Sequence, residues 1–312
     1  NFIYIDVPTS WFGNLTVPPA LGVPGFATPA HPYNYVCLAF WTYPSAAVDS
    51  AGVWANISSK MGANSYGTTT QQIQATLKKN FTNAGVKLMV SAFGSTQTPT
   101  TSKFDAVDTA TQLAKFATDN LFDGVDVDWE DTKSFLLGDS SGENWLITFT
   151  QTLRKLLPAG SIITHAPQAP YFAPYIQGST SLYPKGAYLT VDQQVGPLID
   201  FYNVQFYNQG KGVYDTAAGL FNVSGGWAPK TSINEIIASG VPKGKIVLGK
   251  PVTTKNARSG WMSSTNLNNA IKANFPYNGW NTGVMFWQFK SDMNGSFCNA
   301  VWAGVQGQNQ DI

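Results

Sequence analysis

The chain has 312 residues, of which 43% are hydrophobic and only 12% are charged, against an average near 25% charged in soluble proteins. Such a chain can bury a large core, which excludes a disordered protein. Its net charge of +1, with no basic run anywhere, leaves no electrostatic footprint for nucleic acid or an anionic membrane surface, so a neutral ligand fits better.

The length is compatible with one domain, because barrels of alternating strands and helices routinely reach this size. The longest apolar stretch, around residues 35–41, is far shorter than the roughly 20 residues that span a bilayer. No signal peptide precedes Asn1, so we expect a soluble, processed mature form.

Short apolar runs rich in β-branched and aromatic residues recur along the chain and predict strands. Their ranges are 2–5, 35–41, 87–92, 124–129, 162–165, 201–207, 246–249 and 283–289. Between most of them lie helical patterns with one apolar face, at 70–79, 105–120, 144–157 and 232–238, the third with Ser140 or Ser141 available as a cap. This alternation predicts an α/β fold, a single (β/α)8 TIM barrel over residues 1–312.

Two connections depart from this rhythm. The first crossover, residues 7–34, carries prolines at positions 8, 18, 19, 24, 29 and 32, so we expect mostly irregular loop there. The stretch between His165 and Phe201 is rich in aromatic residues without a helical period. It predicts a small hairpin or an extended rim, serving either as a packed loop or as a wall on which sugars stack.

Cysteine and histidine are scarce, with two of each. Structural zinc needs about four such ligands and most nucleophile triads need a histidine, so we expect neither a metal nor another cofactor. Cys37 lies inside a strand-like run and Cys298 near the other end of the chain, which disfavours a disulfide between them. Glycosylation sequons are consistent with a secreted, extracellular protein and stand at Asn14, Asn56, Asn80, Asn222 and Asn294.

The fourth predicted strand carries an acidic pattern, D-x-x-D-x-D-x-E, from Asp123 through Asp126 and Asp128 to Glu130. The last three acids alternate with Val125, Val127 and Trp129, so their carboxylates should point to one face, the barrel interior, with Glu130 at its mouth. A solvated acidic edge conflicts with the large apolar residues between the acids. A metal site conflicts with the lack of a second acidic cluster.

Carboxylates about 6.6 Å apart along a strand cannot all be ionised comfortably in a confined interior. We expect Asp126 and Asp128 to share protons and Glu130 to be available as a general acid, which suits cleavage of a glycosidic bond. Asp128 lies on the same side as Glu130 and cannot attack the sugar from the opposite face. If cleavage retains configuration, the nucleophile must come from elsewhere, and an N-acetyl group of the substrate can supply it.

The acidic pattern resembles the signature of glycoside hydrolase family eighteen, the retaining chitinases. Residues 87–95 (KLMVSAFGS), 166–170 (APQAP), 204–208 (VQFYN) and 283–288 (GVMFWQ) resemble further strand motifs of its smaller plant and fungal members. The stretch 251–282 is too short for the additional domain found in some other members, which implies an open, shallow groove.

The resemblance implies a role for each matching residue. Glu130 resembles the proton donor, Asp128 the carboxylate that stabilises an oxazolinium intermediate, Asp126 its partner, and Tyr207 the tyrosine that bonds the acetyl oxygen. Trp287 would stack beneath the sugar at the cleaved position, and the same resemblance implies substrate contacts for Gln205, Asn208, Phe40 and Gln168.

The resemblance therefore implies an endo-acting chitinase that cleaves chitin or N-acetylglucosamine oligosaccharides as a monomer. Two alternatives remain open: an endo-β-N-acetylglucosaminidase acting on the cores of N-linked glycans, and a chitinase-like lectin that binds sugar without cutting. The lectin is disfavoured because Glu130 and Asp128 are both present, and VQFYN favours the chitinase.

Overall fold

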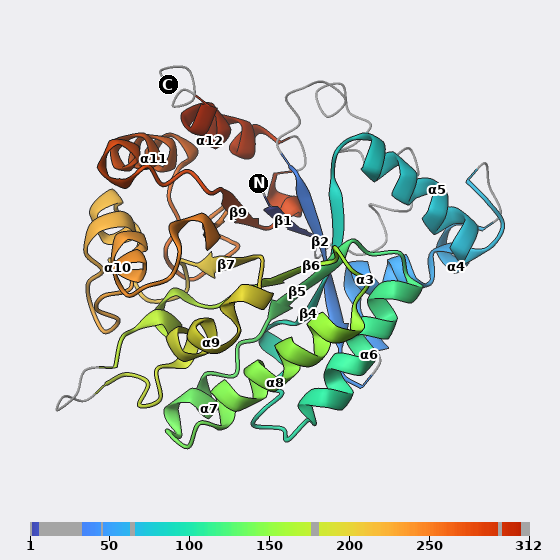
Figure 1. Cartoon of the computed structure of the whole chain (residues 1–312). Coiled ribbons are helices and arrows are strands. Elements are labelled where there is room, and N and C mark those ends of the chain that lie inside the picture. The colour runs from blue at the N-terminus through green and yellow to red at the C-terminus, as the bar shows by residue number, and fades with distance from the viewer. Residues whose placement is uncertain are drawn as a thin grey trace.

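The computed structural model describes residues 2–5, 33–44, 46–62, 66–175, 181–292 and 295–306. Eight parallel strands follow one another around a closed barrel, in which β1 pairs with both β2 and β9 (Figure 1). The predicted single (β/α)8 TIM barrel is confirmed. The strands are β1 Phe2–Ile5, β2 Tyr35–Thr42, β4 Lys87–Phe93, β5 Gly124–Asp128, β6 Ile162–His165, β7 Phe201–Gln205, β8 Ile246–Pro251 and β9 Val284–Trp287. A two-residue strand, β3 Ala46–Ala47, pairs antiparallel with the end of β2.

The four predicted helices are present as α5 Thr70–Asn83, α6 Ala106–Asp119, α8 Ser141–Leu156 and α10 Ile233–Ala238. Capping boxes begin two of them, with Thr69 and Gln72 at α5 and Ser232 and Glu235 at α10. The predicted serine cap of α8 is wrong. Ser140 takes a left-handed conformation without a side-chain cap, and Asp139 Oδ1 instead accepts a hydrogen bond from the Ser141 N–H at 2.9 Å.

The outer layer holds further helices that the sequence analysis does not predict: α3 Asp49–Ala55, α4 Ile57–Met61, α7 Thr132–Leu136, α9 Ala187–Val195, α11 Ser264–Asn278 and α12 Ser296–Gln306. Together the helices surround the strands (Figure 1). Between β8 and β9 the chain forms one helix, α11, and no additional domain. No described helix has the length and apolar composition needed to cross a membrane.

The hairpin or rim predicted between His165 and Phe201 is wrong for the residues described there. Tyr171, Tyr183 and Tyr188 are buried and pack against one another, with α9 contributing Tyr188. These rings hold α9 against the barrel instead of forming an open wall. The first crossover, predicted to be mostly loop, lies outside the described residues from 6 to 32.

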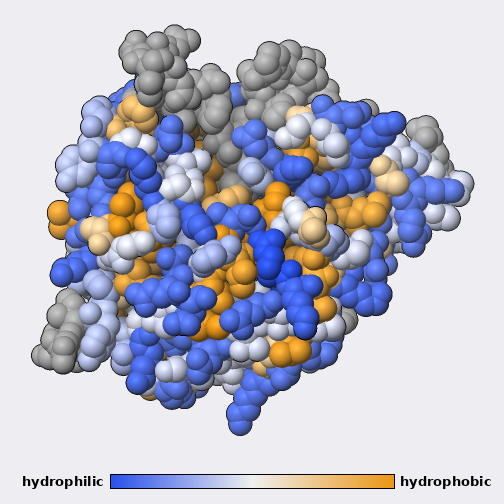
Figure 2. All heavy atoms as spheres, in the orientation of Figure 1, coloured by the Kyte–Doolittle hydropathy of each residue, from blue (hydrophilic) through white to orange (hydrophobic). Residues whose placement is uncertain are grey.

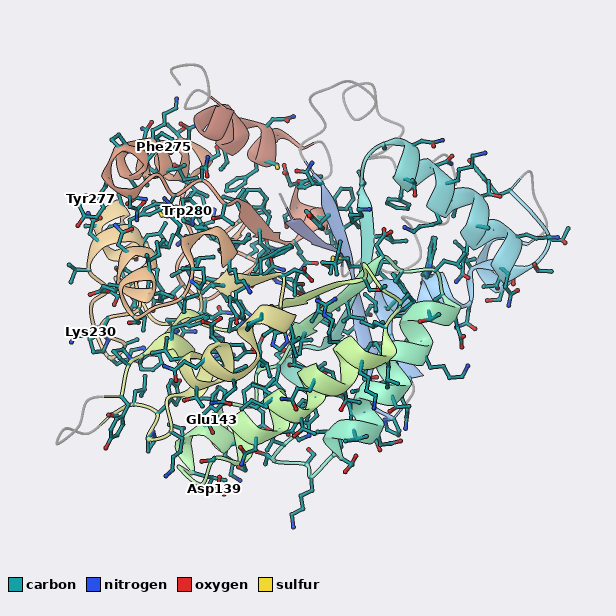
Figure 3. All side chains as sticks on the ribbon, viewed as in Figure 1. Asp139, Glu143, Lys230, Phe275, Tyr277 and Trp280 are labelled. Carbon is teal, nitrogen blue, oxygen red and sulfur yellow. The ribbon has the colours of Figure 1, made fainter. Side chains whose placement is uncertain are left out.

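The barrel interior is apolar toward the amino ends of the strands, where Cys37, Met89, Val247 and Met285 form one buried cluster. Cys37 and Cys298 are both buried and form no disulfide with each other, which agrees with the prediction from their positions in the sequence. On the face viewed in Figure 2, hydrophilic residues are widespread and hydrophobic residues form separate patches among them. Figure 3 shows the side chains in the same view, with Asp139 just before α8 and Tyr277 on α11.

Candidate active site

Strand β5 places the acidic residues at successive levels of the barrel interior. Asp123 lies at its amino end, where its carboxylate accepts the Leu88 N–H at 2.7 Å and pairs with Lys78, away from the pocket described below. Asp126 and Asp128 point inward and are buried. Trp129 points outward and packs on Phe135, with the ring centroids 4.6 Å apart. The predicted alternation of the acidic strand is thus confirmed, although the strand ends at Asp128.

Asp126 is fully buried, and neighbouring strands supply hydrogen bonds to its carboxylate. Oδ2 accepts from Ser91 Oγ at 2.9 Å, while Oδ1 accepts from Thr164 Oγ1 at 2.6 Å and Asn203 Nδ2 at 3.0 Å. A buried carboxylate is tolerable only when such donors replace water. Asp126 therefore forms a fixed polar layer beneath Asp128.

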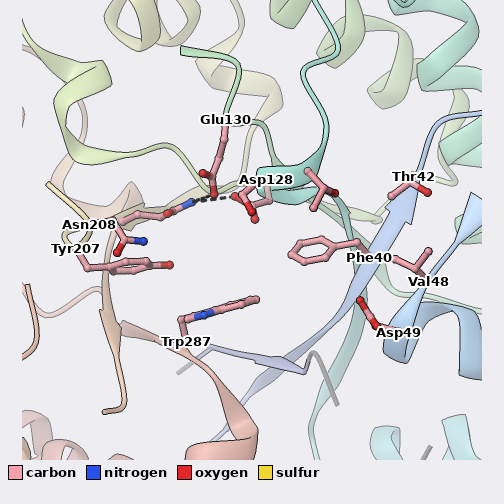
Figure 4. A pocket seen from close by; sticks show the side chains of 12 residues that line it. Phe40, Thr42, Val48, Asp49, Asp128, Glu130, Tyr207, Asn208 and Trp287 are labelled. Carbon is pink, nitrogen blue, oxygen red and sulfur yellow. Dashed lines mark hydrogen bonds between the residues drawn. The ribbon is translucent and has the colours of Figure 1, made fainter. Parts of the chain in front are cut away.

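The carboxylates of Asp128 and Glu130 both accept hydrogen bonds from one side-chain amide. Gln205 Nε2, at the end of β7, donates to Asp128 Oδ1 at 2.9 Å and to Glu130 Oε1 at 3.2 Å (Figure 4). The same nitrogen donates to the Ala166 carbonyl at 2.9 Å, which fixes the amide in place. The two carboxylates that approach this nitrogen therefore lie on one side of the site.

A second amide reaches the other oxygen of Glu130. Gln168 Nε2 donates to Glu130 Oε2 at 3.1 Å, and Gln168 Oε1 accepts from Gln209 Nε2 at 3.1 Å. Two glutamines thus fix both carboxylate oxygens of Glu130 at the carboxyl end of the barrel, which is where barrel enzymes place their chemistry.

A pocket of about 500 Å³ opens beside these acids, and Figure 4 shows the side chains that enclose it. The indole of Trp287, at the end of β9, forms one wall, and the Tyr207 hydroxyl points into the same space. Phe40 from β2 stacks near Trp287, with ring centroids 6.2 Å apart and an interplanar angle of 27°. A Cβ at Gly94 would lie 2.9 Å from the Phe40 ring, so only glycine fits behind it.

Asn208 also lines the pocket, and its side chain is fixed because Oδ1 accepts the Arg258 N–H at 2.8 Å. Behind Tyr207 the chain approaches closely at Gly260, which has a φ of +84°; a Cβ there would lie 2.6 Å from the Tyr207 Cα. This loop therefore holds the backbone of Tyr207 and Asn208 from outside the barrel.

Burial shifts several pKa values in this region. Burial raises the pKa of Asp128 well above its ordinary value, and the nearby charges of Glu130 and Asp126 raise it further. Burial also raises the pKa of Tyr207, and the negative charges of the same acids raise it further, so the Tyr207 hydroxyl stays protonated and can donate a hydrogen bond. Burial lowers the pKa of His165 to about 3, which leaves this ring neutral.

The structure brings all nine sequence-predicted site residues to one end of the barrel: Phe40, Asp126, Asp128, Glu130, Gln168, Gln205, Tyr207, Asn208 and Trp287. It adds Ser91, Thr164 and Asn203 around Asp126, together with Gln209 beside Gln168. Asn203, Gln205 and Tyr207 stand at every second position of the sequence and therefore point to the same face of the strand. This spacing is the signal from which Asn203 could have been predicted.

The end of β2, the start of α3 and the turn after β4 supply the rest of the pocket, and sequence reasoning misses these residues because they lie beyond the predicted strands. They are Thr42, Val48, Asp49, Ser95 and Thr96. Within the described ranges, no group of three histidine, cysteine or acidic side chains is arranged to hold a metal ion.

Comparison of the chain with models of known protein families identifies its family. The model of the glycosyl hydrolases family 18 matches residues 12–303. The chain belongs to this family. A family 18 protein of this kind is a glycoside hydrolase, and the acidic residues described above fall within the matched region. No curated protein sequence matches the chain.

Solved structures agree with the family assignment. A family 18 chitinase from Pseudoalteromonas aurantia is 28% identical with a TM-score of 0.70, over 97% of this chain and 99% of that one. A plant class V chitinase mutant from Cycas revoluta, in complex with (GlcNAc)3, shares the fold at 14% identity and a TM-score of 0.62, over 97% and 98% of the two chains. So does a xylanase and α-amylase inhibitor protein from Scadoxus multiflorus, at 16% identity and a TM-score of 0.56, over 97% of each chain.

Proposed function

We propose that this family 18 glycoside hydrolase is an endo-acting chitinase that cleaves β-1,4 linkages between N-acetylglucosamine units with retention of configuration. The observation that carries the proposal is the single amide of Gln205 that contacts both Asp128 and Glu130 beside the Trp287 wall. This geometry supports two acidic groups acting together on one face of a sugar bound over the indole.

Glu130 is the proposed proton donor to the leaving oxygen and later the base that activates water. Its carboxylate borders the pocket, and two glutamine amides orient it. Such fixed orientation supports proton transfer because a general acid must meet its acceptor at hydrogen-bonding distance. Asp128 is the proposed partner that orients the substrate amide and stabilises the positive charge that develops on it, and Asp126 supports Asp128 from below.

The proposed nucleophile is the carbonyl oxygen of the acetamido group of the substrate. A protein nucleophile for retention has to attack from the face opposite the acid, at about 5 Å from it, whereas Asp128 lies on the side of Glu130. The other carboxylate lining the pocket, Asp49, lies beyond Phe40 (Figure 4). Attack by the acetamido oxygen forms an oxazolinium ring, to which the Tyr207 hydroxyl would donate a hydrogen bond.

The remaining proposed substrate contacts follow from the positions of the side chains around the pocket. Trp287 presents its indole face to the apolar face of the cleaved sugar, with Phe40 at its edge. Gln205, Asn208 and Gln168 surround the acetamido and leaving oxygens with amide groups. No step in this mechanism needs a metal or a cofactor.

We further propose that the enzyme acts outside the cell as a monomer. The sequon residues Asn56 and Asn222 are exposed and Asn80 is partly exposed, which supports glycosylation during secretion; Asn14 and Asn294 lie outside the described residues. A mobility shift after enzymatic removal of N-glycans, together with the mass in solution, tests both points.

The test of the proposed function is cleavage of N-acetylglucosamine oligomers, measured by chromatography of the products. We expect internal cleavage of the hexamer, no cleavage of a fully deacetylated chain of equal length, and inhibition by a thiazoline mimic of the intermediate. Faster release of glycans from a glycoprotein would assign the endo-β-N-acetylglucosaminidase activity instead. Binding of the hexamer without any cleavage would assign a lectin.

A further inference from the structure

A lysine, Lys250, is buried on the outer face of β8, and its side chain is 0% exposed. The preceding residue, Gly249, faces the barrel interior, where a Cβ would lie 2.5 Å from Met285 Cε. Lys250 therefore points to the opposite side, between the strands and the outer layer. Among the described residues no carboxylate lies within ion-pairing distance of its ammonium. Lysine is almost never fully buried unless it is paired, so its presence here needs an explanation.

Backbone carbonyls surround the ammonium of Lys250 in place of a carboxylate. Its Nζ donates to the carbonyls of Tyr214 at 2.6 Å, Gly260 at 2.9 Å and Phe206 at 3.0 Å. A lysine ammonium has three N–H donors, so all of them are used. The three acceptors belong to the residue that follows β7, the loop beyond it and the loop after β8. One side chain thus holds three separate segments of the chain together.

One of these carbonyls adjoins the tyrosine of the pocket. The Phe206 carbonyl belongs to the peptide bond that joins Phe206 to Tyr207, whose hydroxyl points into the pocket (Figure 4). The Gly260 loop packs behind the same peptide, since a Cβ at Gly260 would lie 2.8 Å from the Phe206 carbonyl oxygen and 2.6 Å from Tyr207 Cα. Lys250 therefore fixes the peptide plane from which Tyr207 extends, together with the loop that packs against it.

The charge of Lys250 depends on pH in the neutral range. Burial lowers the pKa of Lys250 to about 7, although the charge of Asp215 in the loop after β7 raises it. Below that pH the side chain is an ammonium with three donors, whereas the neutral amine has two donors and a lone pair that would face a carbonyl oxygen. The arrangement of three carbonyls therefore requires the charged form, which is present in mildly acidic solution.

We propose that Lys250 is a positioning residue that holds the Tyr207 hydroxyl at the place where the acetamido oxygen of the substrate reacts. This inference rests on the proposed function, in which Tyr207 donates a hydrogen bond to that oxygen. Turnover is sensitive to such alignment, since a misplacement of about 1 Å can cost roughly 10²-fold. It predicts that removal of the ammonium slows catalysis through Tyr207 and leaves the binding of the sugar chain largely intact.

The experiment is a double-mutant cycle of Lys250→Met and Tyr207→Phe, with kcat and KM measured on the N-acetylglucosamine hexamer in mildly acidic solution. Methionine is close to lysine in length but offers no donors to the carbonyls. We expect Lys250→Met to lower kcat about 10-fold or more, with KM within about 2-fold of the parent. Once Tyr207→Phe has removed the hydroxyl, Lys250→Met should change kcat by less than about 2-fold further.

The matched control is Lys245→Met. Lys245 stands just before β8, at the amino end of the barrel, and its Nζ also donates to backbone carbonyls, those of Gly196 and Ile199. This variant should keep the parental kcat. Thermal unfolding checks that each variant is folded. If Lys250→Met does not fold, Lys250→Gln takes its place in the cycle; its shorter side chain keeps two amide donors, so its loss of kcat should be smaller.

Three results would overturn the positioning role. The first is an unchanged kcat in the folded Lys250 variants. The second is a loss that multiplies in full with that of Tyr207→Phe, because Lys250 would then act on the site by another route. The third is an equal fall in kcat for Lys245→Met. In each case the parent still cleaves the hexamer, so the proposed chitinase stands. A parent enzyme that does not cleave the hexamer would overturn the proposed function, and the positioning role with it.

Discussion

The two ends of the barrel interior have opposite chemistry. Toward the amino ends of the strands, Cys37, Met89, Val247 and Met285 form an apolar layer. Closer to the carboxyl ends, Ser91 from β4, Thr164 from β6 and Asn203 from β7 surround the buried Asp126 with donors, and Asp128 and Glu130 follow above. Because every second residue of a strand points inward, β4 contributes to both layers, through Met89 and Ser91.

The apolar layer and the acidic layer serve different purposes, since the first stabilises the fold and the second carries the catalytic groups. The apolar layer stabilises the barrel by removing carbon from water, at roughly 25 cal/mol per Å² buried. The acidic layer costs free energy of desolvation that hydrogen bonds only partly offset, as the raised pKa of Asp128 indicates. Substitutions at the amino end should therefore alter stability alone, and those at the carboxyl end should mainly alter activity.

The largest effect is expected for Glu130→Gln, which keeps the shape of the side chain but removes the proton it transfers. Turnover should fall by a factor on the order of 10² or more, because general acid catalysis contributes at least that much. Thermal unfolding should match the parent. Near-parental turnover in the folded variant would remove Glu130 from the mechanism.

At the opposite end, Met89→Ala should destabilise the protein by about 2–5 kcal/mol, since it opens a cavity in a fully buried position. Denaturant unfolding measures the loss, and the fraction that remains folded should keep the parental kcat. Met89→Leu, which conserves volume, is the control and should cost less than about 1.5 kcal/mol. A fall in kcat without loss of stability would contradict the separation of the two layers.

Trp287→Ala tests the pocket wall. Oligomer binding should weaken by roughly 1 kcal/mol, the value of one stacking contact, and stability should fall because the indole packs beside Phe40. Isothermal titration with the tetramer measures the affinity, with Trp287→Phe as the variant that keeps an aromatic face. If the Trp287→Ala variant bound the oligomer with the affinity of the parent, Trp287 would have a packing role and no role in sugar binding.

The smallest effect concerns pH. Because the pKa of Asp128 is raised in the folded state, its stabilising contribution is present in acid and is lost as pH rises through the folded pKa. Asp128→Asn removes this titration, so its Tm should exceed that of the parent by a few degrees at neutral pH, and the difference should vanish in acid. Asp119→Asn, at an exposed ion pair, is the control. A constant difference across pH would show that burial of Asp128 is not the cause.

The same variant should also lose turnover, because an amide cannot supply negative charge beside the oxazolinium. A stabilised but inactive Asp128→Asn protein would therefore sharpen the comparison, since one side chain would lower stability and promote catalysis at once.

Most of the barrel is predictable from the sequence because its strands are short, strongly apolar runs, and parallel strands buried on both faces produce that pattern. The acidic residues are predictable for the same reason, as Asp126 and Asp128 interrupt such a run at every second position. The carboxyl end of β5 is predicted one residue too far, since the apolar pattern extends to Trp129 while pairing stops at Asp128.

The missed helices carry weaker sequence signals than the predicted ones, although Ser263 caps the start of α11. Helix α11 is rich in asparagine and contains Pro276, and α9 begins after Gly186 without a side-chain cap. The donors Ser91 and Thr164 are missed because only the register between strands brings them to Asp126, at the pairs Ser91↔Asp126 and Asp126↔Thr164.

The most direct test of the central claim, cleavage with retention of configuration, is proton NMR of the anomers released in the first minutes of hexamer cleavage. With Asp128 and Glu130 on one side of the sugar, the account predicts that the new reducing end appears first as the β anomer and only then mutarotates. Initial release of the α anomer would contradict it, because inversion requires water activated on the face opposite the acid.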